Sequence, residues 1–154
     1  MDHLLQPPPL VGDNTCNTDN RPSRLSALNP QDLRIGGFIP TTTVDYPDHL
    51  AAVIFTQGCP WRCRYCHNSH LAAWKQQEEF DWNDIFPLLK RRRNLLDGVV
   101  FSGGEPTAQP ALASAITEVK ALGYKIALHS GGPRPDHFKA ILPGVDWVGF
   151  DIKG

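Results

Sequence analysis

Three closely spaced cysteines are the residues of this sequence best suited to chemistry. Cys59, Cys63 and Cys66 have the spacing C-x3-C-x2-C. The segment between them is too short to send the thiolates in different directions, so they must face one centre. Cysteine thiolates are the usual ligands of a [4Fe–4S] cluster, which has four iron corners. Three local cysteines would fill three corners and leave the fourth iron open to a substrate.

Other interpretations of this cysteine segment stay open at this point. Cys63 to His67 matches the C-x-x-C-H haem attachment pattern, although that pattern leaves Cys59 unused and haem attachment normally requires export. A structural zinc ion needs four nitrogen or sulfur ligands, and His67, His70 or Cys16 could complete such a set. Cys16 could instead close an iron–sulfur site as its fourth ligand. The three thiols could also simply be free.

A second motif, Ser102-Gly103-Gly104-Glu105-Pro106, comes directly after an apolar run. Paired glycines let a ligand approach the backbone closely, and the carbonyl groups or Glu105 could receive an ammonium group. Alone, a glycine-rich turn between a strand and a helix is common. The Ser102–Pro106 motif becomes a specific signal because it lies one βα unit after the cysteine motif.

The apolar pattern indicates which elements position these motifs. A short strand is expected within residues 33–40, followed by buried strands at 51–55 and 99–101 and by further strands at 124–129 and 145–150. Helices are expected between them, from Asp81 or Asn83 to the basic run Lys90–Arg93, over 112–122 and over 136–142. This alternation predicts an α/β fold with a parallel sheet and right-handed crossovers.

The motifs all follow predicted strands. In parallel α/β folds, chemistry gathers at the carboxyl ends of the strands. The cysteine segment, the Ser102–Pro106 motif, His129 to Gly132 and Asp151 all occupy such ends. We therefore expect them to converge on one site.

Length and composition limit the remaining possibilities. A chain of 154 residues fits one domain, and a net charge of −1 gives no reason to expect a nucleic acid or membrane partner. There is no signal-like N-terminus and no apolar run approaching the ~20 residues of a membrane helix, so we expect a cytoplasmic protein with reduced thiols. Residues 1–32 are polar and proline-rich, which predicts a disordered extension before a core at 33–154.

Four segments resemble the radical-SAM activating enzymes of glycyl-radical enzymes, and most of all the branch that activates anaerobic ribonucleotide reductase. The segments read TQGCPWRCRYCHN, FSGGEPTAQ, ALHSGG and VDWVGFDIKG. The resemblance implies a partial (β/α) radical-SAM barrel of parallel strands. Members of that family close six βα units, whereas this chain stops after the fourth of the strands expected from residue 51 onward. We therefore expect a core that is truncated at its C-terminal end.

The resemblance also implies the role of individual residues. Cys59, Cys63 and Cys66 would ligate a [4Fe–4S] cluster, and the amine and carboxylate of S-adenosylmethionine (SAM) would chelate the fourth iron. The residues implied to contact SAM are Tyr65, His67, Gly103, Gly104, Glu105, His129, Asp151 and Lys153. At His129 some activating enzymes carry an acidic residue, so a structural role for this histidine is equally open.

In the implied mechanism the reduced cluster passes one electron to the sulfonium of SAM. The carbon–sulfur bond breaks to give methionine and a 5′-deoxyadenosyl radical, which abstracts hydrogen from a backbone glycine of the partner. The implied partners are a glycyl-radical enzyme, with anaerobic ribonucleotide reductase expected, and an electron donor such as flavodoxin or ferredoxin. Two alternatives stay open: a cluster-binding remnant without catalysis, and a radical-SAM enzyme that acts on a small molecule.

Overall fold

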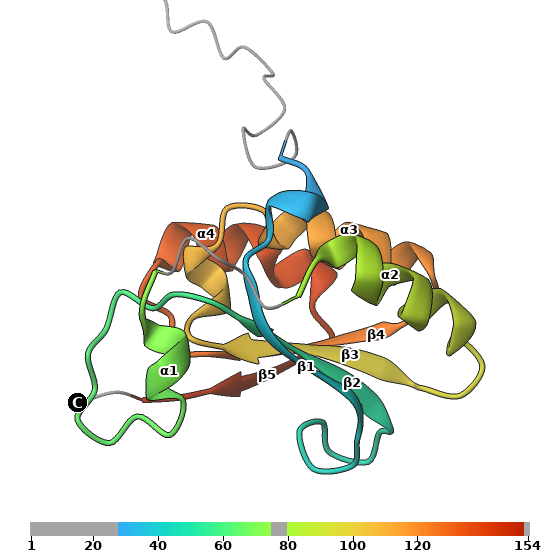
Figure 1. Cartoon of the computed structure of the whole chain (residues 1–154), viewed down its shortest axis with the longest axis horizontal. Helices are drawn as coiled ribbons and strands as arrows, with labels where there is room; N and C mark the ends of the chain where they lie inside the picture. The colour runs from blue at the N-terminus through green and yellow to red at the C-terminus, as the bar shows by residue number, and fades with distance from the viewer. Residues whose placement is uncertain (1–27, 75–79, 153–154) are drawn as a thin grey trace, which may run out of the picture.

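A five-stranded sheet with helices packed on one of its faces forms the fold (Figure 1). The computed structural model describes residues 28–74 and 80–152. The strands are β1 (Ile35–Thr42), β2 (Ala51–Thr56), β3 (Gly98–Gly103), β4 (Lys125–Ser130) and β5 (Trp147–Phe150). The helices are α1 (Ser69–Ala72), α2 (Trp82–Arg91), α3 (Leu112–Ala121) and α4 (Pro135–Ile141). Three single 3₁₀ turns complete the described elements: η2 (Pro30–Asp32), η3 (Pro106–Ala108) and η4 (Leu142–Gly144).

The predicted α/β architecture is confirmed, with one difference in strand direction. β2, β3, β4 and β5 are the four strands predicted between residues 51 and 150, and they pair in parallel in chain order. β5 is only partly buried. β1 pairs antiparallel with β2, which the expectation of a parallel sheet did not anticipate. The connection 43–50 is too short for a crossover, because a parallel pair needs a connection of about a dozen residues or more. The sheet is open, as expected for a partial barrel.

The main core lies between the sheet and the three longer helices. α2 buries Trp82, Ile85 and Leu89, and α3 buries residues with the same helical spacing, including Leu112 and Ile116. Asp81 is the N-cap of α2, and its carboxylate accepts a hydrogen bond from the backbone N–H of Asn83 at 2.7 Å. These helices lie on one side of the sheet in Figure 1. The sequence pattern had predicted each of the three helices to within about two residues of its observed bounds.

The opposite face of the sheet is covered by the 43–50 connection rather than by a helix. Tyr46 from this connection packs with Val53, Val100 and Ala127, and Trp147 closes the group from β5. α1 is a short helix that no sequence pattern indicated, since four residues cannot display a helical period. In the two stretches that the structure describes, no helix is both long and apolar enough to cross a bilayer.

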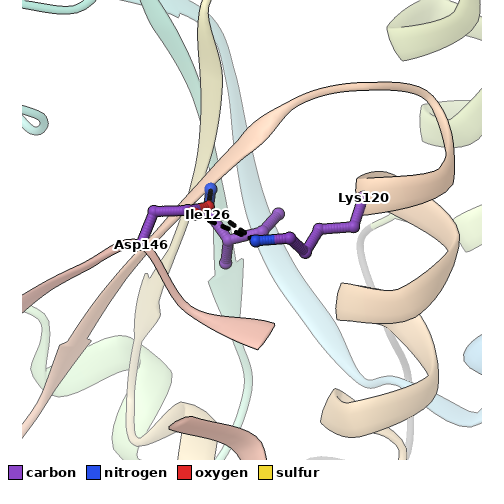
Figure 2. A network of polar contacts seen from close by, with 3 residues as sticks. All are labelled: Lys120, Ile126 and Asp146. Atoms are coloured by element: carbon purple, nitrogen blue, oxygen red, sulfur yellow. Dashed lines mark hydrogen bonds and ion pairs between the residues drawn. The ribbon is translucent and has the colours of Figure 1, made fainter. Parts of the chain in front are cut away.

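Asp146 fixes the start of β5 to its neighbours. Figure 2 shows that its carboxylate accepts from Lys120 Nζ of α3, at 2.9 Å and 3.0 Å, and from the backbone N–H of Ile126 in β4, at 2.7 Å. Burial acts to raise the pKa of Asp146, but the hydrogen bond from Ile126 and the charge of Lys120 together hold it below the usual value. The carboxylate is therefore a stabilising group only while it is ionised.

We predict that Asp146→Asn lowers the free energy of unfolding by about 1 kcal/mol at pH 7, because the variant loses the ion pair and weakens the bond to Ile126. Solvent screening keeps the effect small, since both charged side chains are more than one-third exposed. A carboxyl group with a lowered folded-state pKa stabilises above its unfolded pKa of about 3.9, and this contribution is lost as the pH falls. Urea unfolding at pH 7 and pH 3 should therefore show the two proteins converging in acid. The exposed Asp84→Asn is the control, and an equal loss in both variants would contradict the assignment.

Candidate cofactor site

The carboxyl ends of the parallel strands open into one cleft of about 1190 Å³. Ligand pockets are typically about 300–1,000 Å³, so this cleft is large enough for a nucleotide together with a metal cluster. The structure brings together on its walls nearly all the residues expected at the site: Cys59, Cys63, Tyr65, Cys66, His67, Gly103, Gly104, Glu105, His129 and Asp151. Lys153 lies outside the described residues.

The cysteine loop, residues 58–74, is closed at its base by its own backbone. The N–H of Gly58 donates to the carbonyl of Leu71 at 2.7 Å, and the N–H of Cys59 donates to Ala72 at 3.0 Å. These two bonds bring the end of α1 back beside the end of β2. The three cysteines therefore lie on a loop whose ends are fixed.

The side chain of Gln57 also holds the ends of this loop together. The sequence analysis did not predict this role. Its side chain is only 3% exposed, and Nε2 donates to the carbonyls of Ala73 at 2.6 Å and His70 at 3.3 Å. Its own backbone carbonyl accepts from Gln109 Nε2 at 2.5 Å. The available signal was the position of this glutamine, directly after an apolar strand and before a glycine. An amide that is buried at such a position needs several hydrogen-bond partners.

The paired glycines of the Ser102–Pro106 motif are required by the fold itself. A Cβ on Gly104 would lie 2.4 Å from the carbonyl oxygen of Gly58 and 2.8 Å from that of Leu71. Gly103 has a φ of +120°, and a Cβ there would lie 2.3 Å from the backbone nitrogen of Thr56. The motif therefore packs backbone against backbone on the base of the cysteine loop. The N–H of Glu105 completes this contact by donating to Gly58 O at 2.9 Å.

Glu105 is a buried carboxylate that accepts four hydrogen bonds from the described residues. It is 3% exposed. Oε1 accepts from the N–H of Thr107 at 2.9 Å, from Thr107 Oγ1 at 2.5 Å and from Ser130 Oγ at 2.7 Å. Oε2 accepts from the N–H of Gly131 at 3.0 Å. Four donors compensate the charge, so this carboxylate holds the turns after β3 and β4 in fixed relative positions.

His129 joins three segments at the edge of the cleft. Its Nε2–H donates to the backbone carbonyl of Asp45 at 2.9 Å, and Nδ1 lies 3.3 Å from Ser102 Oγ. The ring also makes an edge contact with Trp147, at 5.7 Å between centroids. Both ring nitrogens thus have protein partners, which supports the structural role that the sequence left open. The cleft still contacts this residue.

The three thiols differ in exposure: Cys59 and Cys63 are half-buried, and Cys66 is exposed. Burial raises the pKa of the Cys59 thiol, a hydrogen bond from the Trp61 backbone opposes this shift, and the nearby charges of Glu105, Cys63 and Cys66 add to it. Without a cation, the Cys59 thiol thus favours its protonated form. A metal would reverse this preference, since thiolates are the ligating form and binding releases the protons.

Within the described residues, no three His, Cys, Asp or Glu side chains are close enough to hold a single metal ion. A cubane makes a different demand, because each thiolate binds its own iron corner and the sulfurs stand farther apart. The donor set of three thiols on the wall of one cleft therefore fits such a cluster.

The other expected contacts lie at the rim of the cleft. Tyr65 is 59% exposed, and His67 and Asp151 are also exposed. The backbone N–H of Asp151 donates to Ser130 O at 3.0 Å, which extends the β4–β5 pairing to the rim. All three residues line the cleft and are accessible to a ligand.

Comparisons with known proteins agree with this geometry. The family described as the radical SAM superfamily matches residues 53–154. A protein of Methanocaldococcus jannaschii named as a glycyl-radical enzyme activating enzyme is 32% identical, over 77% of this chain and 50% of that protein. The pyruvate formate-lyase-activating enzymes of Clostridium pasteurianum and Staphylococcus aureus (strain USA300) are 34% and 36% identical, over 71% and 72% of this chain and 48% and 49% of those proteins.

A solved structure supports the fold alone. The crystal structure of QueE from Escherichia coli superposes with a TM-score of 0.51 at 19% sequence identity, covering 65% of this chain and 52% of that one. The chain thus spans about half the length of the curated relatives it matches.

We predict that Gly104→Ala destabilises the protein by about 2–3 kcal/mol, because the new Cβ would overlap two fixed backbone carbonyls. Gly37→Ala is the control, since a Cβ there would meet Phe55 only at an ordinary 3.5 Å. Chemical unfolding measures both. Equal stability of the two variants would show that the contact between Gly104 and Gly58 is not tight.

We predict that Glu105→Gln costs about 2–3 kcal/mol of stability. If the amide oxygen replaces Oε1, the amide NH₂ faces the N–H of Gly131 and two donors oppose each other. Ser130→Ala removes only one donor to Oε1 and should cost less. A Glu105→Gln variant that unfolds like the unsubstituted protein would contradict this structural role.

Proposed function

This chain belongs to the radical SAM superfamily, whose members use a [4Fe–4S] cluster and SAM, and on that premise we propose that it is a radical-SAM activating protein. In this proposal Cys59, Cys63 and Cys66 bind three irons of the cluster, and SAM occupies the adjacent cleft. The acceptor of the radical is a backbone glycine of a partner enzyme. The observation that carries the proposal is the convergence of the three thiols with the turns after β3 and β4 on one cleft.

The cysteine loop suits a cluster that must keep one iron open. Its three cysteines are local, and its ends are fixed by Gly58 and Gln57. In the described stretches no cysteine besides these three is present, so no fourth thiolate is offered within them. Held by Cys59, Cys63 and Cys66, the cluster would supply the one-electron reduction by which members of the superfamily cleave the sulfonium of SAM.

The residues of this chain would orient SAM rather than exchange protons with it. Gly103 and Gly104 present backbone at the cleft wall, and the Glu105 network holds this wall against the turn at Gly131. In this proposal Tyr65 and His67, in the cysteine loop, would contact the nucleoside part of SAM. Both line the cleft, as does Asp151 after the end of β5. A fixed wall limits water and holds the reacting atoms in position.

The partner is proposed from the relatives and from the sequence motifs. The relatives are named for glycyl-radical enzymes in general and for pyruvate formate-lyase in particular. A glycyl-radical enzyme is therefore the proposed partner class. Within that class, the amino acids in and around the cysteine and Ser102–Pro106 motifs favour anaerobic ribonucleotide reductase as the partner. Activity and partner are proposals for this chain, because the similarity covers about half of each relative.

Anaerobic reconstitution with iron and sulfide tests the proposal. We expect about four irons per chain and, after reduction by dithionite, formation of 5′-deoxyadenosine from SAM. Cys59→Ser, Cys63→Ser and Cys66→Ser should each lose most of the iron and at least about 100-fold of the cleavage rate, because each removes a cluster ligand. Iron analysis, electron paramagnetic resonance and product chromatography measure these outcomes.

Cys16→Ser is the matched control, since it removes a thiol from the same chain outside the cysteine loop. It should keep both the iron and the cleavage activity. Loss of the cluster in this variant would mean that a fourth protein thiolate closes the site. Four irons without SAM cleavage would instead support a remnant, and one zinc per chain would defeat the cluster proposal.

A further inference from the structure

Trp61 connects the cysteine loop to the turn after β4. It lies between Cys59 and Cys63 and is half-buried. A Cβ on Gly131 would lie 2.2 Å from Cζ3 and 2.7 Å from Cη2 of Trp61, so the indole ring is seated directly against the backbone of Gly131. Both residues line the cleft. The ring therefore joins two of its walls.

The turn that receives the ring is held by hydrogen bonds. The N–H of Gly131 donates to Glu105 Oε2 at 3.0 Å, and Ser130 Oγ donates to Oε1 of the same carboxylate at 2.7 Å. Ser130 Oγ also accepts from the N–H of Gly132 at 3.0 Å. The first half of the cysteine loop thus rests on a surface that Glu105 holds in place, in addition to the bonds at the base of the loop.

The backbone of Trp61 faces the sulfur of Cys59. Its N–H donates a hydrogen bond to that sulfur, which opposes the increase that burial causes in the pKa of the thiol. Hydrogen bonds to the sulfur ligands are one of the factors that set the reduction potential of an iron–sulfur cluster. Such a bond stabilises the reduced cluster more than the oxidised one, because reduction adds negative charge to the cluster and its thiolates. The donor and the seated ring belong to one residue, so a shift of the ring would also move the donor.

On the basis of the proposed function, we infer that Trp61 is a positioning residue, whose ring on Gly131 holds its backbone N–H at the sulfur of Cys59 and so raises the reduction potential of the cluster. A ring that merely shields the cluster from water predicts the opposite sign. Loss of a shield admits water, which favours the more highly charged reduced cluster and raises the potential. Loss of the N–H···S bond lowers the potential. The direction of the change therefore distinguishes the two roles.

Gly131→Ala in the full chain, reconstituted anaerobically with iron and sulfide, tests this role. The φ of Gly131 is not in the left-handed region, so alanine suits the backbone, and its Cβ would displace the ring of Trp61. At a fixed solution potential, the ratio of reduced to oxidised cluster should fall about 3- to 10-fold, the range of one net hydrogen bond. A tenfold change corresponds to about 59 mV for a one-electron couple. Redox titration followed by electron paramagnetic resonance, without SAM, measures the ratio.

A second variant and a second measurement accompany this titration. Trp61→Leu keeps apolar bulk on the loop but not the seated ring, so it should lower the ratio in the same direction, and it carries the measurement if Gly131→Ala assembles no cluster. In the Trp61→Ala background, Gly131→Ala should change nothing, because no ring is left to displace. Nuclear magnetic resonance of the full chain before reconstitution should show the α-protons of Gly131 displaced by the ring current of Trp61.

Gly149→Ala is the matched control, because Gly149 lines the same cleft and its Cβ would press on the ring of Trp147 at 2.9 Å instead. It should keep the ratio of the unsubstituted protein. An unchanged or raised potential in Gly131→Ala would overturn the inference, and so would an equal fall in Gly149→Ala or in the Trp61→Ala background. Absence of the ring-current displacement would overturn the contact itself. Failure of the unsubstituted protein to assemble a cluster would count against the proposed function instead, while the proton shifts would still report the contact.

Discussion

The close backbone contact between Gly58 and Gly104 is the constraint on which the rest of the site depends. Gly58 lies at the start of the cysteine loop, and Gly104 lies in the turn after β3. Neither position leaves room for a side chain, because a Cβ on Gly104 would meet the Gly58 carbonyl and one on Gly58 would meet the ring of Trp74. Two neighbouring parallel strands therefore end in a single packed unit. This unit brings the three thiols beside the wall proposed to bind SAM.

Much of this arrangement could be predicted from local patterns. The run Ala51–Phe55 predicted β2, because burial on both faces of a strand leaves a continuous apolar run. The spacing of Leu112, Ile116 and Val119 predicted α3, because burial on one face of a helix leaves a readable period. The position of the motifs after strands predicted their convergence. Each of these inferences needs only neighbouring residues and the rule that parallel strands end at one edge of the sheet.

The rest depended on contacts between residues far apart in the sequence. The antiparallel direction of β1 follows from a short connection rather than from any pattern within the strand. Gln57, Gln109 and Ser130 looked like ordinary polar residues, and only the folded chain shows that they are buried and paired. Glu105 was expected to meet SAM, and the structure shows four donors from the chain itself at that carboxylate. Local sequence cannot reveal how the hydrogen-bonding capacity of a buried group is divided.

The bonds at the base of the cysteine loop also have a consequence for the order of assembly. Gly58 pairs with Leu71 nearby in the sequence, but its carbonyl accepts from Glu105, which is made much later during synthesis. Loop closure within the cysteine segment can precede the rest, whereas the wall opposite it forms only when β3 has docked beside β2. A nascent chain that ends before Glu105 would therefore expose three thiols without their opposing wall, open to oxidation. The three thiols therefore meet iron and sulfide in their final surroundings only after β3 has docked beside β2.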